Sequence, residues 1–204
     1  MTYDTLASDD AIVATISALK ERGIEAEVVN TRGDALAKVK ELIPAGASVN
    51  NGSSTTLQEI GLVDYLKGET PWVNLHAKVL AESDPAKQKQ LRQEAYFADY
   101  YLGSVHALAQ TGEMVIASNT SSQLPPLLTT SQNVILVVST QKIMPTLNEA
   151  LARLREYVVP LEDARMKSTG ASGTILSKIV IFEKEPAFMG RKVCVIFIKE
   201  KLGF

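Results

Sequence analysis

The chain has 204 residues, of which 46% are hydrophobic and 22% charged, and its formal net charge is −2. This length suits one domain with a substantial core, and the composition excludes a disordered chain or a membrane chain. Proteins that bind nucleic acid generically carry a basic stripe, so the slightly negative charge argues against nucleic acid as a partner.

Predicted helices and strands alternate through the first half of the chain. Helices are predicted where apolar residues recur at helical spacing, and strands where short apolar runs stand between turn residues. In chain order the pattern predicts a helix over 9–22, a strand over 24–29, a helix over 34–42, a strand over 47–50 and a helix over 56–66. This order is typical of an α/β fold with a mostly parallel central sheet and helices on both faces.

The second half continues the alternation after a helical insertion. Asp84 before Pro85 is typical of a helix start, and a helix is predicted over 87–98. The remaining elements are strands over 100–107, 114–117 and 133–139, a helix over 144–157, and two apolar runs over 175–182 and 193–198. The two last runs are interpreted as a hairpin that finishes the sheet. Because no repeat or linker stands out, residues 1–204 are interpreted as one domain, on which the first helix (about 8–22) packs.

A loop of small residues follows the second predicted strand. Gly52 permits a tight turn, and the hydroxyl residues Ser53, Ser54, Thr55 and Thr56 precede a predicted helix whose first N–H groups are free. Such a loop is typical of a binding site for a phosphate or a carboxylate.

Helix capping is the alternative interpretation of the same loop. Thr56 with Glu59, and Thr55 with Gln58, each match the spacing of a capping box. Neither the Gly-Lys-Ser/Thr phosphate loop nor the three-glycine dinucleotide pattern is present. Both interpretations therefore stay open at the level of the sequence.

A second polar loop follows the strand predicted over 114–117. Its candidate ligand-binding residues are Asn119, Thr120, Ser121, Ser122 and Gln123. In a doubly wound sheet, ligands bind outside the carboxyl ends of the strands, so the two loops are predicted to line one crevice. The alternative is that the second loop only caps a helix that begins near Leu124.

Four charged residues near these loops are further candidates. Lys142 follows the strand over 133–139 and would neutralise a bound anion, so Lys142→Met is expected to weaken anion binding with little loss of stability, whereas a plain surface lysine is the alternative. Glu113 and Asp99 are the candidates for a catalytic base, if a crevice buries them and raises their pKa. Arg165 would clamp a carboxylate with two hydrogen bonds.

Cysteine and histidine are too few and too scattered to predict a metal site. Cys194 lies in an apolar run and is interpreted as a buried strand residue, and His76 and His106 lie far apart. No cofactor-binding pattern is evident. Since no signal segment opens the chain and the longest apolar runs have the length of a strand, we expect a cytoplasmic protein without membrane contact.

An ordered set of motifs resembles the LUD-domain family, in its shorter subfamily, and that family is associated with bacterial lactate utilisation. The resemblance covers residues 36–204. It rests on the segments Gly46–Val49, Gly52–Gly61, Phe97–Ser104, Thr111–Glu113, Val137–Ile143 and Glu200–Phe204.

The resemblance implies a fold similar to the sugar-phosphate isomerase and CoA-transferase superfamily, with both polar loops and Lys142 on one cleft. This sequence departs from the family pattern in its second loop, which is usually rich in glycine but here reads Ser118 to Ser122. It also has His106 where relatives often have asparagine. Some relatives carry a cysteine cluster that would hold metal, and residues 167–186 contain none.

Three functions agree with these features. The leading hypothesis is binding of a small anionic metabolite, linked by resemblance to the oxidation of lactate or another organic acid. The second is an isomerase or an acyl/CoA transferase, in which Gly52 to Thr56 would hold phosphate and Glu113 or Asp99 would act as base or nucleophile. The third is a non-catalytic subunit that organises redox partners, for which the implied partners are iron–sulfur proteins of a lactate-oxidising system. A homodimer is left open.

Overall fold

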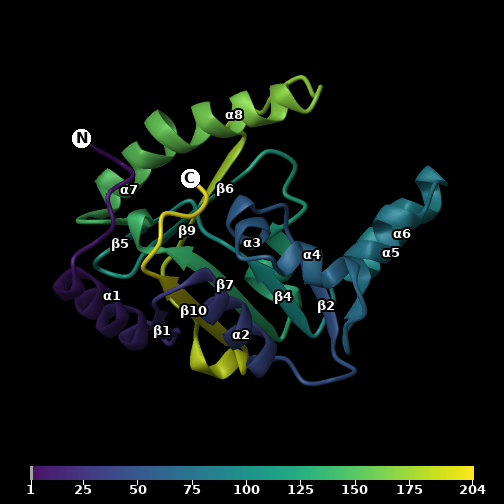
Figure 1. The fold of residues 1–204 in the computed structure, drawn as a ribbon, viewed down its shortest axis with the longest axis horizontal. Helices are drawn as coiled ribbons and strands as arrows, with labels where there is room; N and C mark the ends of the chain where they lie inside the picture. The colour runs from purple at the N-terminus through teal and green to yellow at the C-terminus, as the bar shows by residue number, and fades with distance from the viewer. Residues whose placement is uncertain (1) are drawn as a thin grey trace.

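Two β-sheets organise the chain in the computed structural model, which describes residues 2–204 (Figure 1). The larger sheet is parallel throughout and has the spatial order β1 (Glu25–Val29), β10 (Lys192–Ile198), β7 (Asn133–Ser139), β4 (Tyr100–Gly103), β2 (Ser48–Asn51) and β3 (Val73–Asn74). The smaller sheet has the order β8 (Ile143–Met144), β5 (Ala107–Ala109), β6 (Met114–Ser118) and β9 (Lys178–Phe182), and β6 runs antiparallel to both neighbours.

The helices are α1 (Asp9–Glu21), α2 (Arg32–Leu42), α3 (Thr55–Glu59), α4 (Leu62–Lys67), α5 (Leu75–Ala81), α6 (Pro85–Ala95), α7 (Leu147–Arg153) and α8 (Val159–Ser168). Of these, α2, α3 and α4 pack on the outer face of the large sheet, and α7 packs on that of the small sheet. Short 3-10 turns at Thr140–Lys142 and Ala187–Met189 and π-helical turns at Pro126–Thr130 and Leu154–Val158 complete the regular structure. None of the helices within residues 2–204 is long and apolar enough to cross a membrane.

Local sequence explains why the main elements form where they do. Ser8 caps α1 by accepting from the Ala11 N–H, and Ile12 and Leu19 face the core at helical spacing. Asp84 caps α6 with Pro85 in its first turn, as the sequence predicts. Strand β7 is buried along Val134–Ser139, because neighbouring strands flank it and packed layers cover both of its faces.

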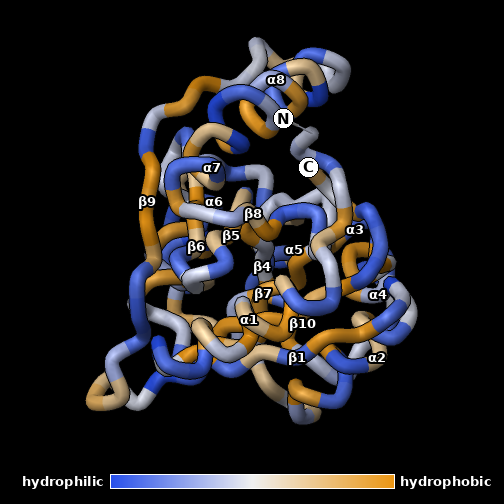
Figure 2. The backbone as a smooth tube through the Cα atoms, turned by 90° about the vertical axis from the view of Figure 1, so that its left-hand side faces the viewer, coloured by the Kyte–Doolittle hydropathy of each residue, from blue (hydrophilic) through white to orange (hydrophobic). Residues whose placement is uncertain are grey.

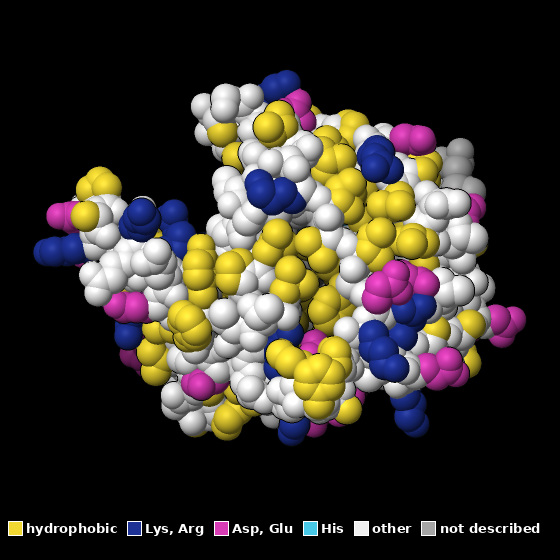
Figure 3. Space-filling model, turned by 180° about the vertical axis from the view of Figure 1, so that it is seen from behind, with side chains coloured by type: hydrophobic (Ala, Val, Ile, Leu, Met, Phe, Trp, Pro, Cys, Tyr) yellow, Lys and Arg dark blue, Asp and Glu magenta, His cyan; other side chains and the backbone are white. Residues whose placement is uncertain are grey.

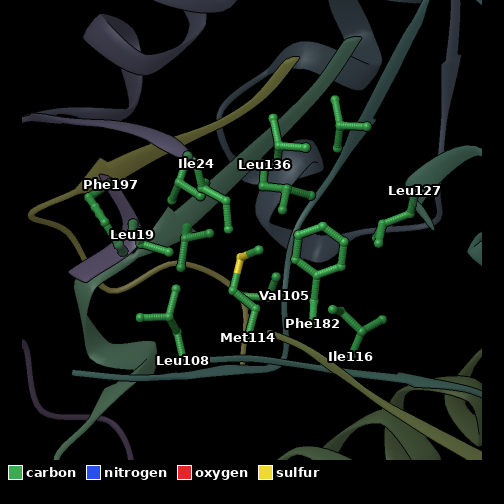
Figure 4. Packing of buried hydrophobic residues seen from close by; sticks show 14 of the residues in the cluster. Leu19, Ile24, Val105, Leu108, Met114, Ile116, Leu127, Leu136, Phe182 and Phe197 are labelled. Atoms are coloured by element: carbon green, nitrogen blue, oxygen red, sulfur yellow. The ribbon is translucent and has the colours of Figure 1, made fainter. Parts of the chain in front are cut away.

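Three clusters of buried side chains lie between the sheets and helices of the fold. The backbone around the interior strands β7 and β10 is coloured mostly as hydrophobic in Figure 2. The first cluster joins the two sheets and includes Leu136 and Phe197 from the large sheet and Met114 and Phe182 from the small one (Figure 4). The second joins the large sheet to α2, α3 and α4, and the third joins the small sheet to α7 and the turn after it. The sequence prediction of an α/β fold with a mostly parallel central sheet and flanking helices is confirmed.

Two strand predictions are wrong. The last two apolar runs do not form a hairpin, because β9 pairs with β6 in the small sheet whereas β10 lies between β1 and β7 in the large sheet. The run over 100–107 is not one strand either. It splits at Ser104–His106 into β4 and β5, which belong to different sheets.

Three helix predictions differ from the structure. The helix expected over 56–66 is broken at Gly61, whose φ of 80° lies in the left-handed region that favours glycine. The helix expected over 144–157 begins at Leu147, because Ile143–Met144 form β8, and it continues to Ser168. Its π-helical turn Leu154–Val158 precedes Pro160, which lacks the N–H of a regular helix residue. Helix α5 was not predicted, and it packs against α6 to form a hairpin that stands away from the body (Figures 1 and 3).

Candidate functional site

The carboxyl ends of β2, β4 and β7 lie side by side at one edge of the large sheet. Asn51 of β2 pairs with Leu102 of β4, and Gly103 of β4 pairs with Leu136 of β7. From β2 the chain passes to β3 on one side and then returns to β4 on the other. The loop after β2 therefore leaves the sheet where the strand order reverses, which is where doubly wound folds bind ligands.

A cavity of about 400 Å³ opens at this edge. Its walls come from both polar loops, from the segment between β4 and β5, from the α5–α6 hairpin, from α8 and from the C-terminal segment. In the view of Figure 3 the α5–α6 hairpin stands apart from the upper part of the molecule, with a notch between them. The predicted ligand-binding residues that line the cavity are Gly52, Ser53, Ser54, Thr55, Thr56, Asn119, Thr120, Ser122, Gln123 and Lys142.

The first loop keeps its backbone donors free. The N–H groups of residues 53–56 donate no hydrogen bond to any part of the chain that the structure describes. Both predicted capping boxes are wrong, because the α3 cap is Ser54, which accepts from the Leu57 N–H, and Glu59 instead accepts from the Gly203 N–H at 2.6 Å. The loop residues, which line the cavity, thus carry several N–H donors without a partner in the described part of the chain.

Gly52 is required by a close approach rather than by its φ angle. A Cβ atom at this position would lie 2.5 Å from the Tyr101 hydroxyl oxygen and 3.9 Å from Cβ of Gln123. The two polar loops therefore approach each other, with the Tyr101 hydroxyl beside Gly52. Tyr101 is 3% exposed and lines the cavity, and its hydroxyl has no hydrogen-bond partner within residues 2–204.

The second loop folds into a tight turn. The Ser121 N–H donates to the Ser118 hydroxyl at 2.9 Å, and the Gln123 amide donates to the Ala117 carbonyl at 2.8 Å. Ser121 has a φ of 66° and is not part of the cavity wall, unlike its neighbours. The helix expected near Leu124 is the single π-helical turn Pro126–Thr130. Hydrogen bonds of the Ser118 and Gln123 side chains therefore hold the loop, and Asn119, Thr120 and Ser122 line the cavity.

Lys142 is buried at the cavity wall, with 3% of its surface exposed. Its Nζ donates to the Thr56 hydroxyl at 3.0 Å and to the Ser104 hydroxyl and Val105 carbonyl at 3.2 Å each. The alternative of a plain surface lysine is wrong.

The charge of Lys142 has no carboxylate partner. No salt bridge within residues 2–204 includes it, and all three of its hydrogen-bond partners are neutral oxygens. Burial lowers the pKa of the Lys142 ammonium to about 7, the Arg153 guanidinium acts in the same direction, and Glu59 acts against it. Near neutral pH the buried ammonium group of Lys142 therefore loses its proton readily and becomes a neutral amine.

Two residues that sequence reasoning did not assign to the site complete its interior. His106 lines the cavity, and its Nδ1 accepts from the Ala117 N–H at 3.1 Å. Arg153 is fully buried behind it, and its guanidinium donates to the His106 and Tyr3 carbonyls. No local pattern marks these roles, because the partners of both side chains lie on other elements.

The C-terminal segment forms one wall of the cavity. The Gln141 amide donates to the Leu202 and Gly203 carbonyls, at 3.1 and 2.8 Å. A Cβ atom on Gly203 would lie 2.3 Å from the Thr56 hydroxyl and 3.2 Å from Lys142 Nζ. Glycine therefore allows this segment to lie directly against the buried lysine.

The two candidate bases lie elsewhere, and neither lines the cavity. Glu113 stands before β6, at the end opposite to the polar loop, where it forms a salt bridge with Arg22 at 2.6 Å and accepts from the Thr111 hydroxyl. Burial raises the pKa of Glu113, but its hydrogen bonds and Arg22 outweigh that effect and lower it.

Asp99 stands before β4 and accepts from the hydroxyl and the N–H of Ser48, which lower the pKa of Asp99. The sequence expected a buried base with a raised pKa, and the structure gives both carboxylates the opposite shift. The acid–base assignment is therefore not supported by the geometry.

Arg165 lies on α8 and reaches the cavity wall. It already pairs through two hydrogen bonds with Glu162 on the same helix, at 2.7 Å each. No cluster of metal-ligating side chains is found among residues 2–204.

Comparison with known proteins gives two matches. A family model described as the LUD domain matches residues 12–198. Among solved structures, the chain is similar to a DUF162 family protein from Deinococcus radiodurans, with a TM-score of 0.52 and 14% identity over 95% of this chain and 99% of that chain. At this identity the likeness shows the fold alone. None of the curated proteins matches the chain.

Proposed function

The chain belongs to the LUD-domain family, and from this premise we propose that it binds a small anionic metabolite in the cavity between its two polar loops. The observation that carries the proposal is Lys142, a buried ammonium group whose partners are all neutral. A buried charge without a counter-charge costs considerable free energy, and an anion beside it would offset that cost.

The surrounding donors support the same ligand chemistry. The free N–H groups of residues 53–56 and the Tyr101 hydroxyl line the cavity together with Lys142. Carboxylates and phosphates accept several hydrogen bonds at once, and they bind best where donors are already held in place. The cavity wall contains one carboxylate side chain, Glu162, which Arg165 neutralises.

Membership in the family links the ligand to organic-acid metabolism, with lactate or a related carboxylate as the first candidate. The same proposal includes iron–sulfur proteins of a lactate-oxidising system as partners. It also includes a cytoplasmic location. A similarity of the fold to the sugar-phosphate isomerase and CoA-transferase superfamily stays a prediction. The isomerase or transferase alternative loses its named bases, since neither Glu113 nor Asp99 reaches the cavity.

A thermal-shift screen tests the proposal. The probes are lactate, pyruvate, sugar phosphates, nucleotides and CoA esters. A ligand present at about 100 times its dissociation constant adds about 2.7 kcal/mol to the free energy of unfolding. We expect stabilisation by at least one small anion, and a screen in which no anion stabilises the protein would contradict the proposal.

A pair of lysine variants locates the site. Lys142→Met removes the charge and keeps most of the side-chain packing, so we expect the stabilisation by the anion to disappear. Lys192→Met is the matched control, because Lys192 is exposed at the opposite end of β10 and should leave the stabilisation unchanged. Equal stabilisation of parent, Lys142→Met and Lys192→Met would place the anion elsewhere.

A further inference from the structure

His106 faces the cavity with one ring nitrogen occupied and one free. Its Nδ1 accepts from the Ala117 N–H, so Nδ1 carries no proton and Nε2 carries the proton of the neutral ring. Nε2 has no hydrogen-bond partner in the part of the chain that the structure describes, and the imidazole belongs to the cavity wall. A donor N–H is therefore available to a bound ligand.

Two buried cations hold this segment from both sides. Lys142 Nζ donates to the carbonyl of Val105, and the Arg153 guanidinium donates to the next carbonyl, that of His106. Both cations oppose a positive charge on the ring, and burial opposes it most, so the pKa of His106 falls to about 3. The imidazole stays neutral across the physiological range of pH.

We propose that His106 is a specificity-determining residue, whose neutral Nε2–H donates to an uncharged carbonyl or hydroxyl oxygen next to the anionic group of the ligand. This inference rests on the proposed function, since it assumes that the anionic group lies at Lys142.

The pairing of donors determines the class of ligand. Lys142 is the charged donor that matches an anionic oxygen, whereas the His106 imidazole and the Tyr101 hydroxyl are neutral donors in the same cavity. A simple carboxylate leaves the His106 donor without an acceptor in the ligand, and a donor that a ligand covers without bonding costs free energy. In the proposed complex the carboxylate lies at Lys142, and an oxygen on the adjacent carbon accepts from the His106 Nε2–H.

Selectivity between matched acids tests the inference. Acetate and glycolate differ by one hydroxyl, and propionate and lactate differ in the same way. One neutral hydrogen bond corresponds to about a three- to tenfold difference in affinity. We expect the parent protein to bind glycolate and lactate more tightly than acetate and propionate by that factor.

Two variants of His106 separate its proposed bond to the ligand, made by Nε2, from its bond to the Ala117 N–H, made by Nδ1. In His106→Asn the side-chain oxygen can replace Nδ1 as the acceptor for the Ala117 N–H, but no donor reaches the position of Nε2. In His106→Gln the amide N–H reaches further toward the position of Nε2. We expect His106→Asn to reduce the affinity ratio to about 1 and His106→Gln to restore part of it. An unchanged ratio in His106→Asn would overturn the inference.

Nitrogen NMR of the imidazoles reports the tautomer of His106 before a ligand is added and its contact with a ligand afterwards. The chain contains two histidines, so His76→Asn assigns the remaining signal to His106. We expect the tautomer protonated at Nε2, without titration between pH 5 and 8, and a shift of that signal with glycolate but not with acetate. A ring protonated at Nδ1, or charged at pH 7, would overturn the inference.

The outcomes separate the inference from the function on which it rests. If acetate and glycolate bind equally and Lys142→Met abolishes both, the anion site stands and the role of His106 is refuted. If the parent binds none of the four acids, the proposed function fails for carboxylates, and the inference fails with it.

Discussion

Arg191 and Lys142 are cations with buried side chains at opposite ends of the large sheet. The side chain of Arg191 is 3% exposed and pairs with Glu185, itself 4% exposed, at 3.2 Å. It also donates to the carbonyls of Leu127, Leu128 and Ser131. Lys142 is also buried, but it forms no salt bridge within residues 2–204.

The surroundings of Arg191 and Lys142 differ, and the difference separates a cation that stabilises the fold from one that is a candidate for binding a ligand. Arg191 is neutralised by the fold itself and holds the chain after the π-helical turn against the start of β10. Lys142 forms no salt bridge within residues 2–204 and lines the cavity, which supports the proposed anion as its counter-charge. Burial alone therefore does not distinguish the two, whereas the carboxylate partner of Arg191 and the cavity beside Lys142 do.

Removal of the buried Arg191–Glu185 salt bridge should change the free energy of unfolding more than any other substitution considered. Arg191→Met leaves the Glu185 carboxylate buried without a partner, so we expect it to lower the free energy of unfolding by about 3–5 kcal/mol. Urea unfolding measures the change. The double variant Arg191→Met with Glu185→Met should recover part of the loss, and a single variant as stable as the parent would remove the contrast with Lys142.

The next effect appears in the pH dependence of Lys142→Met. Since the pKa of Lys142 is lower in the folded chain, at about 7, than in the unfolded chain, the unfolded state binds more protons above pH 7. The parent should therefore gain stability as the pH rises, by about 1.4 kcal/mol per unit for one proton. Between pH 7.5 and 9 we expect the parent to gain about 2 kcal/mol relative to Lys142→Met.

Urea unfolding at several pH values gives this difference directly. Lys192→Met should follow the parent, because that lysine is exposed. A constant difference between parent and Lys142→Met over this range would mean that the Lys142 pKa is not lowered by folding.

A smaller effect concerns the approach of the two loops at the cavity. Gly52→Ala places a Cβ atom 2.5 Å from the Tyr101 hydroxyl oxygen, so we expect a loss of about 1 kcal/mol in stability. Tyr101→Phe removes the hydroxyl and should relieve much of the loss in the double variant. Thermal unfolding of the four proteins measures the coupling, and additive losses would show that the hydroxyl does not lie beside Gly52.

The smallest change in stability is expected for Glu113. Its carboxylate forms a salt bridge, as Glu185 does with Arg191, but it lies nearer the surface. Glu113→Gln weakens its salt bridge with Arg22, and we expect a loss of about 0.5 kcal/mol in stability. Because the pKa of Glu113 is lowered by folding, this loss should shrink as the pH falls through that pKa. Stabilisation by the anion should not change in Glu113→Gln. A Glu113→Gln variant that no longer binds the anion would show that Glu113 contributes to the site.

The sequence predicts the layers of the fold better than the partners of its strands. The boundaries of β7 match the prediction of 133–139, because a buried apolar run is a local signal. The partners of β9 and β10 are chosen by contacts between distant segments, which no local pattern reports. The break between β4 and β5 is hidden for the same reason, since both strands are apolar and buried.

The polar loops of the site can be found in the sequence, but the charges of the site cannot be interpreted from it. Small residues after a strand indicate the loops at Gly52 and Asn119. Whether a lysine or a carboxylate is buried depends on what packs over it, so Lys142, Glu113 and Asp99 look alike in the sequence. The role of His106 depends on the Ala117 N–H, eleven residues away on the neighbouring strand.

The pH dependence of carboxylate binding shows whether the ammonium of Lys142 is the counter-charge of the ligand. Pyruvate and lactate stay ionised between pH 6 and 9, so any change in their affinity over this range comes from the protein. If the ammonium of Lys142 is the counter-charge, affinity should fall by up to about tenfold per pH unit above the pKa of about 7, and Lys142→Met should show neither binding nor pH dependence. Binding that is constant from pH 6 to 9, or retained in Lys142→Met, would contradict the account.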